Sequence, residues 1–128
     1  MKALFFVLSA IFFMGCGPSQ RAVKDYTIGQ VKTINVGETI ISWGYTNVDW
    51  ADRPMNAQKA SLIFNGRDAN TLFIAYREEY ENMQGSFAKP AFNNELKYAA
   101  NQKIIRYKDH EIEVISVNDR EMVVKILK

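Results

Sequence analysis

The sequence has very little of the residues that most often carry enzymatic or metal chemistry. Its 128 residues include only one cysteine and one histidine, and prolines are also few, at three. A single cysteine cannot form a disulfide within the chain, and one histidine beside it does not supply the ligand set of a zinc site. We therefore expect no metal site, no cofactor and no enzymatic activity.

Runs of basic residues are also missing. The net charge is only +2, and no cluster of lysines or arginines is present that could neutralise a phosphate backbone. Nucleic acid is therefore excluded as a partner. A composition of 48% hydrophobic and 23% charged residues is that of an ordinary globular domain rather than a disordered chain.

Long hydrophobic runs are absent except near the N-terminus. The apolar stretch at residues 3–14 is far shorter than the about 20 residues that a membrane-spanning helix needs. It has no polar face, which argues against a surface helix of the domain, and no A-x-A site of an ordinary secretory signal follows it. Lys2 precedes the stretch, and Gly15-Cys16 ends it.

This order resembles the lipobox of bacterial lipoproteins, although Phe13 stands where such signals usually have leucine. The resemblance implies a signal peptide at residues 1–15, fatty-acyl chains on Cys16, a tether at 16–25 and a single domain at 26–128. It also implies a lipid-anchored protein of the bacterial cell envelope, with its domain facing the periplasm or the cell exterior. The residue after the cysteine is Gly17, and this pattern resembles that of lipoproteins sent to the outer rather than the inner membrane.

The remainder reads as a small all-β domain. Short runs of β-branched and aromatic residues alternate with turn signals, and no convincing amphipathic helix is present. The pattern predicts seven or eight short strands in an antiparallel sandwich or barrel. Residues 47–56 read as a loop, with a short helical turn near 55–59. Residues 78–94 form the longest irregular segment.

Two details of the strand pattern are specific. Asn65-Gly66 predicts the turn of a hairpin between residues 60–64 and 71–77, and the second arm is apolar on both faces, as an internal strand would be. In residues 110–117 the apolar positions change parity. A bulge or a strand crossing between layers near Val114-Ile115 would account for this change.

From Phe64 to Tyr98 the chain resembles a group of small uncharacterised exported bacterial proteins, many of them lipoproteins. This resemblance implies the fold and the location but no activity. The matching pieces are Gly66-Arg67, Asn70-Thr71, Tyr76-Arg77-Glu78, Lys89-Pro90-Ala91-Phe92 and Glu95-Leu96-Lys97-Tyr98.

Few residues suggest catalysis. His110 could act as a general base, but no nucleophile motif accompanies it, and we interpret it as a residue beside the Lys108-Asp109 turn. The carboxylates of Glu78, Glu79 and Glu81 could serve glycoside hydrolysis or bind calcium. A solvated strand end, partly neutralised by Arg77, explains them more simply.

Aromatic residues are the remaining candidates for a binding site. Trp43, Tyr45 and Trp50 bracket a glycine-containing turn and could stack against a sugar or small ligand, although packing in the core or at its rim is the alternative. Phe87 and Phe92 lie on a polar segment, where they either pin a loop or form an exposed patch. With Arg77, they are the candidate contacts for a protein partner.

These observations predict a non-catalytic, membrane-anchored envelope lipoprotein that acts through protein–protein contacts in an accessory or structural role. The alternative is a binding module for an envelope glycan or small ligand that uses the aromatic residues at positions 43, 45 and 50. Exposure of both tryptophans in one groove would favour the alternative. An exposed patch at residues 87 and 92 would favour the first function.

Overall fold

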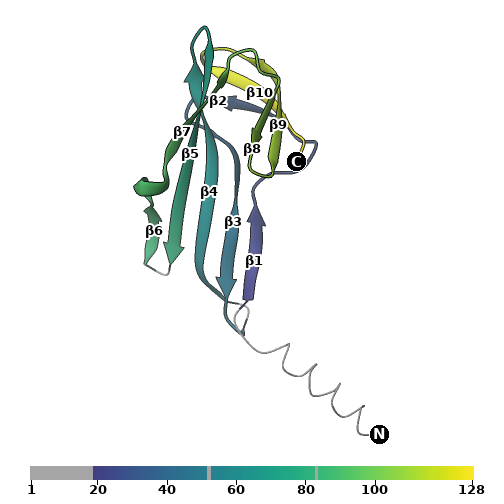
Figure 1. Cartoon of the computed structure of the whole chain (residues 1–128). Coiled ribbons are helices and arrows are strands. Elements are labelled where there is room, and N and C mark those ends of the chain that lie inside the picture. The colour runs from purple at the N-terminus through teal and green to yellow at the C-terminus, as the bar shows by residue number, and fades with distance from the viewer. Residues whose placement is uncertain (1–18, 52, 83) are drawn as a thin grey trace, which may run out of the picture.

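The protein is built from two antiparallel β-sheets (Figure 1). The computed structural model describes residues 19–51, 53–82 and 84–128, and within these residues it has ten strands and one short 3-10 turn, η1 (Pro90–Phe92). The prediction of an all-β fold is confirmed. The sheets do not close into a barrel, so a two-layer arrangement is formed.

Sheet A, the larger sheet, has β5 (Thr71–Asn82) and β4 (Pro54–Arg67) at its centre. Next to β4 follow β3 (Thr39–Val48) and then the edge strand β1 (Ser19–Lys24). The other edge of β5 pairs with two short strands, one beyond the other: β6 (Gly85–Ala88) and β7 (Asn94–Ala99). This pairing on both edges confirms that residues 71–77 belong to an internal strand.

Sheet B has the strand order β2 (Val31–Asn35), β10 (Glu121–Ile126), β9 (His110–Val117) and β8 (Ile104–Tyr107). Alternate side chains of both sheets meet in one hydrophobic core. Sheet A contributes Ile40, Ile41, Leu62, Phe64, Leu72 and Ile74, and sheet B contributes Ile34, Ile105, Ile112, Met122, Val124 and Ile126.

The change of parity in β9 is a β-bulge, as predicted. Val123 of β10 pairs with Ser116, but the next residue, Val124, pairs with Val114, so Ile115 has no partner in the ladder. The extra residue lets Val114 and Val117 both pack against the core, while Ile115 is exposed.

Several strands are longer than the sequence pattern predicted. β3 continues through Gly44, β4 is 14 residues long and starts at Pro54, and β5 continues to Asn82. The prediction of a helical turn at 55–59 is therefore wrong, and residues 78–82 and 85–88 are strands rather than an irregular segment. One reason is that oppositely charged residues such as Lys59 and Glu79 pair across the strands, which a single strand's pattern does not reveal.

The hairpin turn and the proposed tether also differ from expectation. Asp68, not Asn65-Gly66, makes the turn, because its Oδ1 accepts the backbone N–H groups of Asn70 and Thr71. Gly66 instead adopts a φ of 96° where the β4–β5 register shifts. Residues 19–24, assigned to a tether, form β1, because each of them pairs with a residue of β3.

Candidate functional site

Sheet B covers only one end of sheet A (Figure 1). On β3 the residues at positions 40–42 are fully buried, whereas those at 43–47 are only partly buried. On β5 the continuous buried run ends at Tyr76. We call the uncovered end the overhang; it comprises β1, residues 44–48 of β3, 54–59 of β4, 77–82 of β5, and β6.

One face of the overhang continues the surface that packs against sheet B. Strand alternation and the register place a row of partly exposed side chains on this face, because Tyr45 pairs with Gln58, Gln58 with Tyr80, and Tyr80 with Phe87. Glu78 shares this face because it lies two residues from Tyr80 on the same strand. We call this surface the overhang face.

An aromatic cluster closes the core where sheet B ends. The ring centroids of Trp43 and His110 are 4.2 Å apart, and those of Tyr76 and Tyr107 are 5.3 Å apart. Trp43 also lies 6.3 Å from each of these two tyrosines. Trp43 thus packs mainly against other aromatic side chains of the domain.

Lys108 and Glu78 place charges next to this cluster. The Nζ of Lys108 lies 5.2 Å from the ring centroid of Tyr76 and 5.5 Å from that of Tyr107. The hydroxyl of Tyr76 donates a hydrogen bond to Glu78. Burial raises the pKa of Tyr76, and the bond to Glu78 raises it further, so the hydroxyl stays protonated and remains a donor.

A second group of aromatic residues lies at the edge of the overhang. Phe87 and Phe92 are exposed, at 50% and 58% respectively. Tyr80 is the cross-strand partner of Phe87. The Nζ of Lys89 lies 5.8 Å from the ring centroids of both Tyr80 and Phe92, so this cation connects the strand to η1.

A shallow hollow extends from the aromatic cluster to Lys89. Its lining includes residues from the aromatic cluster, the overhang face and both cations: Trp43, Tyr45, Gln58, Tyr76, Glu78, Lys89 and Lys108. The surface that runs from Lys108 to Phe92 is therefore both aromatic and charged, and Lys59 and Glu79 line the hollow as well. Such a mixture is typical of protein interfaces and of sites that bind anionic ligands.

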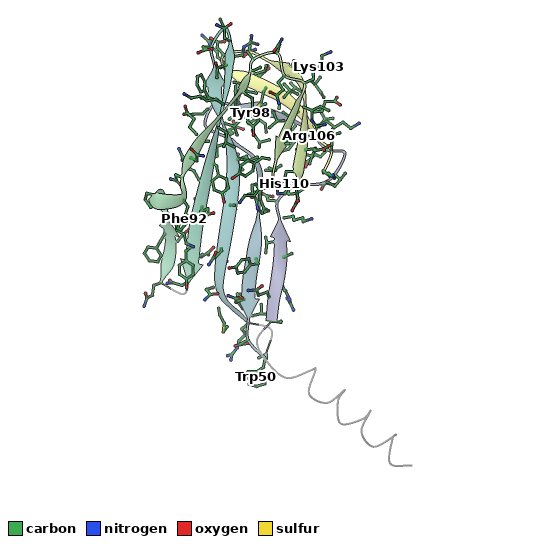
Figure 2. All side chains as sticks on the ribbon, viewed as in Figure 1. Trp50, Phe92, Tyr98, Lys103, Arg106 and His110 are labelled. Atoms are coloured by element: carbon green, nitrogen blue, oxygen red, sulfur yellow. The ribbon has the colours of Figure 1, made fainter. Side chains whose placement is uncertain are left out.

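The structure does not assemble the aromatic platform suggested for residues 43, 45 and 50. Trp43 belongs to the cluster at the end of sheet B, and Tyr45 lies on the overhang face. Trp50 lies at the opposite tip of sheet A, where its side chain is 81% exposed (Figure 2). A stacking surface that uses both tryptophans is therefore not formed.

The three suggested partner contacts are also divided. Phe87 and Phe92 lie at the same edge of the overhang and are linked through Tyr80 and Lys89. Arg77 is exposed, but it follows Tyr76 in β5, so strand alternation directs it to the opposite face of the sheet. Cys16 lies outside the residues that the structure describes.

His110 follows the two-residue turn between β8 and β9, as expected from the sequence. Its Nδ1 lies 3.2 Å from the hydroxyl of Tyr26, and its ring packs against that of Trp43 at an interplanar angle of 44°. Burial lowers the pKa of His110, against the opposing effect of a hydrogen bond to the backbone of Lys128 and the charge of Asp109. His110 is therefore a packed side chain whose neutral form is favoured by its surroundings.

The carboxylates at positions 78, 79 and 81 do not converge on one point. Glu78 faces the aromatic cluster, whereas Glu79 and Glu81 project from the other face of β5. Among the described residues, no group of three acidic, histidine or cysteine side chains is arranged to hold a metal ion. In the same part of the chain, no helix is long and apolar enough to span a membrane.

The comparisons with known proteins contribute no relative: no family model, curated protein or solved structure matches this chain.

Sequence reasoning missed four contributors to the surface, namely Tyr76, Tyr80, Lys89 and Lys108. The sequence does contain a signal for Tyr76 and Tyr80. Tyr76, Glu78 and Tyr80 alternate with charged residues at the spacing of a strand, and this spacing continues the face of Leu72 and Ile74. No comparable signal marks the lysines, because they approach the rings from η1 and from the β8–β9 turn.

Proposed function

We propose that this protein is a lipid-anchored, non-catalytic component of the bacterial cell envelope, and that it binds a protein partner through the overhang face. The observation that carries the proposal is the half-exposed pair Phe87 and Phe92 beside a sheet surface that the domain itself leaves uncovered. Exposed aromatic residues grouped at one edge are enriched in protein interfaces.

The charges beside this surface indicate the chemistry of the partner. Lys89 and Lys108 both lie over aromatic rings and line the hollow, whereas the nearby Glu78 already accepts a hydrogen bond from Tyr76. A partner that inserts apolar side chains against Phe87 and Phe92 and places a carboxylate between the two lysines would match the surface.

The membrane location is supported by the sequence alone. The short apolar stretch, Gly15 and Cys16 resemble a lipobox, and more than one acyl chain on a single residue would hold the protein on a bilayer durably. Mass spectrometry of the mature N-terminus tests this part of the proposal directly.

Photo-cross-linking in intact cells tests the binding surface. A photo-reactive phenylalanine analogue is placed at position 87 and, as a matched control, at position 115. Ile115 is the control site because its exposure of 51% closely matches the 50% of Phe87, while it lies on the bulge of sheet B. We expect a discrete cross-linked protein from position 87 and none of the same mass from position 115.

Variants then establish which side chains bind. Phe87→Ser with Phe92→Ser is expected to reduce co-purification of that cross-linked protein by about tenfold or more, as loss of an interface hot spot does. Ile115→Ser is the control and is expected to leave it unchanged. Equal cross-linking from both positions, or full co-purification with the double variant, would reject the overhang face as the binding surface.

A second candidate function is binding of an anionic envelope glycan or small ligand in the hollow. The observation in its favour is that Trp43 and Tyr45 line one concavity together with Lys89 and Lys108. Titration of the Trp50→Phe protein with a uronic-acid oligosaccharide should change the emission of Trp43. Lys89→Ala with Lys108→Ala should abolish the change. An emission that does not respond to the oligosaccharide would eliminate this candidate.

A further inference from the structure

Trp50 is the most exposed of the large hydrophobic side chains in the described residues, at 81%. It lies on the loop between β3 and β4, at the end of sheet A that is farthest from sheet B (Figure 2). Neither the hydrophobic core nor the overhang face uses this residue. Its exposure requires a separate explanation.

The loop that carries Trp50 is held in shape by Asp49. One carboxylate oxygen of Asp49, Oδ1, accepts the backbone N–H groups of Ala51 and Arg53, at 2.9 and 3.0 Å. The other oxygen accepts the Arg53 side chain at 2.9 Å, and the backbone N–H of Asp49 donates to the carbonyl of Arg53. The indole is thus presented at the tip of a turn fixed by hydrogen bonds.

The start of β1 is next to this tip. Ser19, the first residue of β1, pairs with Val48, which is two residues before Trp50. Only two residues separate Cys16 from Ser19. Because a fully extended chain spans about 3.3–3.6 Å per residue, an acyl chain on Cys16 is attached within about 10 Å of Ser19.

We infer that Trp50 contacts the lipid headgroup region of the membrane and is a second, noncovalent contact beside the acyl anchor. The inference depends on acylation of Cys16 in the proposed function. With so short a connection, the tip of sheet A is held against the bilayer surface. Tryptophan suits this position because its ring is apolar, its N–H can donate to water or headgroups, and it concentrates at membrane interfaces.

This contact also fixes how the domain stands on the membrane. A tether alone would let the domain tilt freely, whereas two adjacent contacts at one end orient the strands of sheet A away from the bilayer. At about 3.3 Å per residue, residues 54–59 of β4 hold sheet B about 20 Å above the tip. The overhang face then lies between the membrane and sheet B, and a partner would bind close to the lipid.

The experiment uses the acylated protein, purified from membranes and reconstituted in phosphatidylcholine vesicles with or without bromine on the acyl chains. Trp43→Phe leaves Trp50 as the only tryptophan, and Trp50→Phe leaves Trp43. Trp43 packs in the aromatic cluster, so a second measurement that keeps Trp43 in place is needed. The emission of the wild type minus the emission of Trp50→Phe gives the Trp50 signal whether or not Trp43→Phe folds. Cys16→Ser in solution supplies the unanchored reference.

We expect brominated lipid to reduce the emission of Trp50 by about half, as for an indole at the interface, and to leave Trp43 unaffected. Emission of Trp50 should also shift to shorter wavelength relative to Cys16→Ser. Unquenched Trp50 in protein shown by mass to be acylated would overturn this inference and leave the proposed anchor and partner surface standing. A chain without acyl groups on Cys16 would overturn both the inference and the anchor.

Discussion

At the scale of single residues, the side chains with functional chemistry are mostly engaged within the domain. His110 is the clearest case, because its ring packs between Tyr26 and Trp43 and its nitrogen faces a hydroxyl rather than a carboxylate. The aromatic residues divide into two kinds. Trp43 packs against the core, whereas Phe87 and Phe92 are exposed. This division favours a binding surface over a catalytic centre.

The environment of His110 predicts that acid destabilises the fold. Burial lowers its pKa in the folded state below the ordinary value of 6.5, so the unfolded chain binds the proton first. Well above pH 6.5 the histidine is neutral in both states and contributes nothing. As the pH falls below 6.5, stability is lost until the pH passes the folded-state pKa. The nearby charges are Lys24 and Lys108, which lower this pKa, and Asp109, which raises it.

Urea unfolding between pH 7.5 and 5.5 measures this effect. Wild-type protein is expected to lose stability across the range, and His110→Phe, which keeps an aromatic ring in the cluster, is expected to lose much less. No other histidine in the chain titrates in this window. An identical loss in both proteins would show that His110 is not responsible.

At the scale of elements, local irregularities set which faces of the strands are apolar. The bulge at Ile115 lets two segments of β9 with opposite parity direct their valines to the same core. A regular strand of the same sequence would expose one of these segments. Cross-sheet hydrogen bonds add to this arrangement, since Lys32 donates to the carbonyl of Ile40 and Arg67 donates to that of Val117.

Deletion of one residue in β9 distinguishes the bulge from the regular ladder. Removal of Ile115 should cost about 1 kcal/mol or less, because the exposed extra residue disappears and Val114 and Val117 still face the core. Removal of Glu113, the control, should cost about 3 kcal/mol or more, because Ile112 and Val114 then become neighbours and cannot both point inward. Chemical denaturation of the two variants gives the comparison. Equal costs would contradict the bulge assignment.

At the scale of the whole molecule, the two sheets differ in length, and this difference creates the candidate site. The long strands β4 and β5 continue past the end of sheet B, so one sheet surface has no packing partner among the described residues (Figure 1). The same geometry places β1 and the Trp50 loop together at one end. The membrane contact and the partner surface in our proposals therefore both depend on the end of sheet A that extends beyond sheet B.

The sequence by itself determined the all-β class, the internal position of residues 71–77 and the irregularity near Ile115. Each of these depends on the alternation of apolar residues along one strand, which is a local property of the chain. The lipobox resemblance is equally local, and it remains a prediction.

Only the tertiary structure decided which residues share a surface. Pairing between strands placed Tyr45, Tyr80 and Phe87 in one row, set Arg77 on the other face and separated Trp50 from Trp43 by the length of the overhang. The extension of β4 through polar residues was equally hidden. The physical reason is that hydrogen-bonded ladders and cross-strand charge pairs join residues far apart in the chain, whereas alternation within one strand reports only its own two faces.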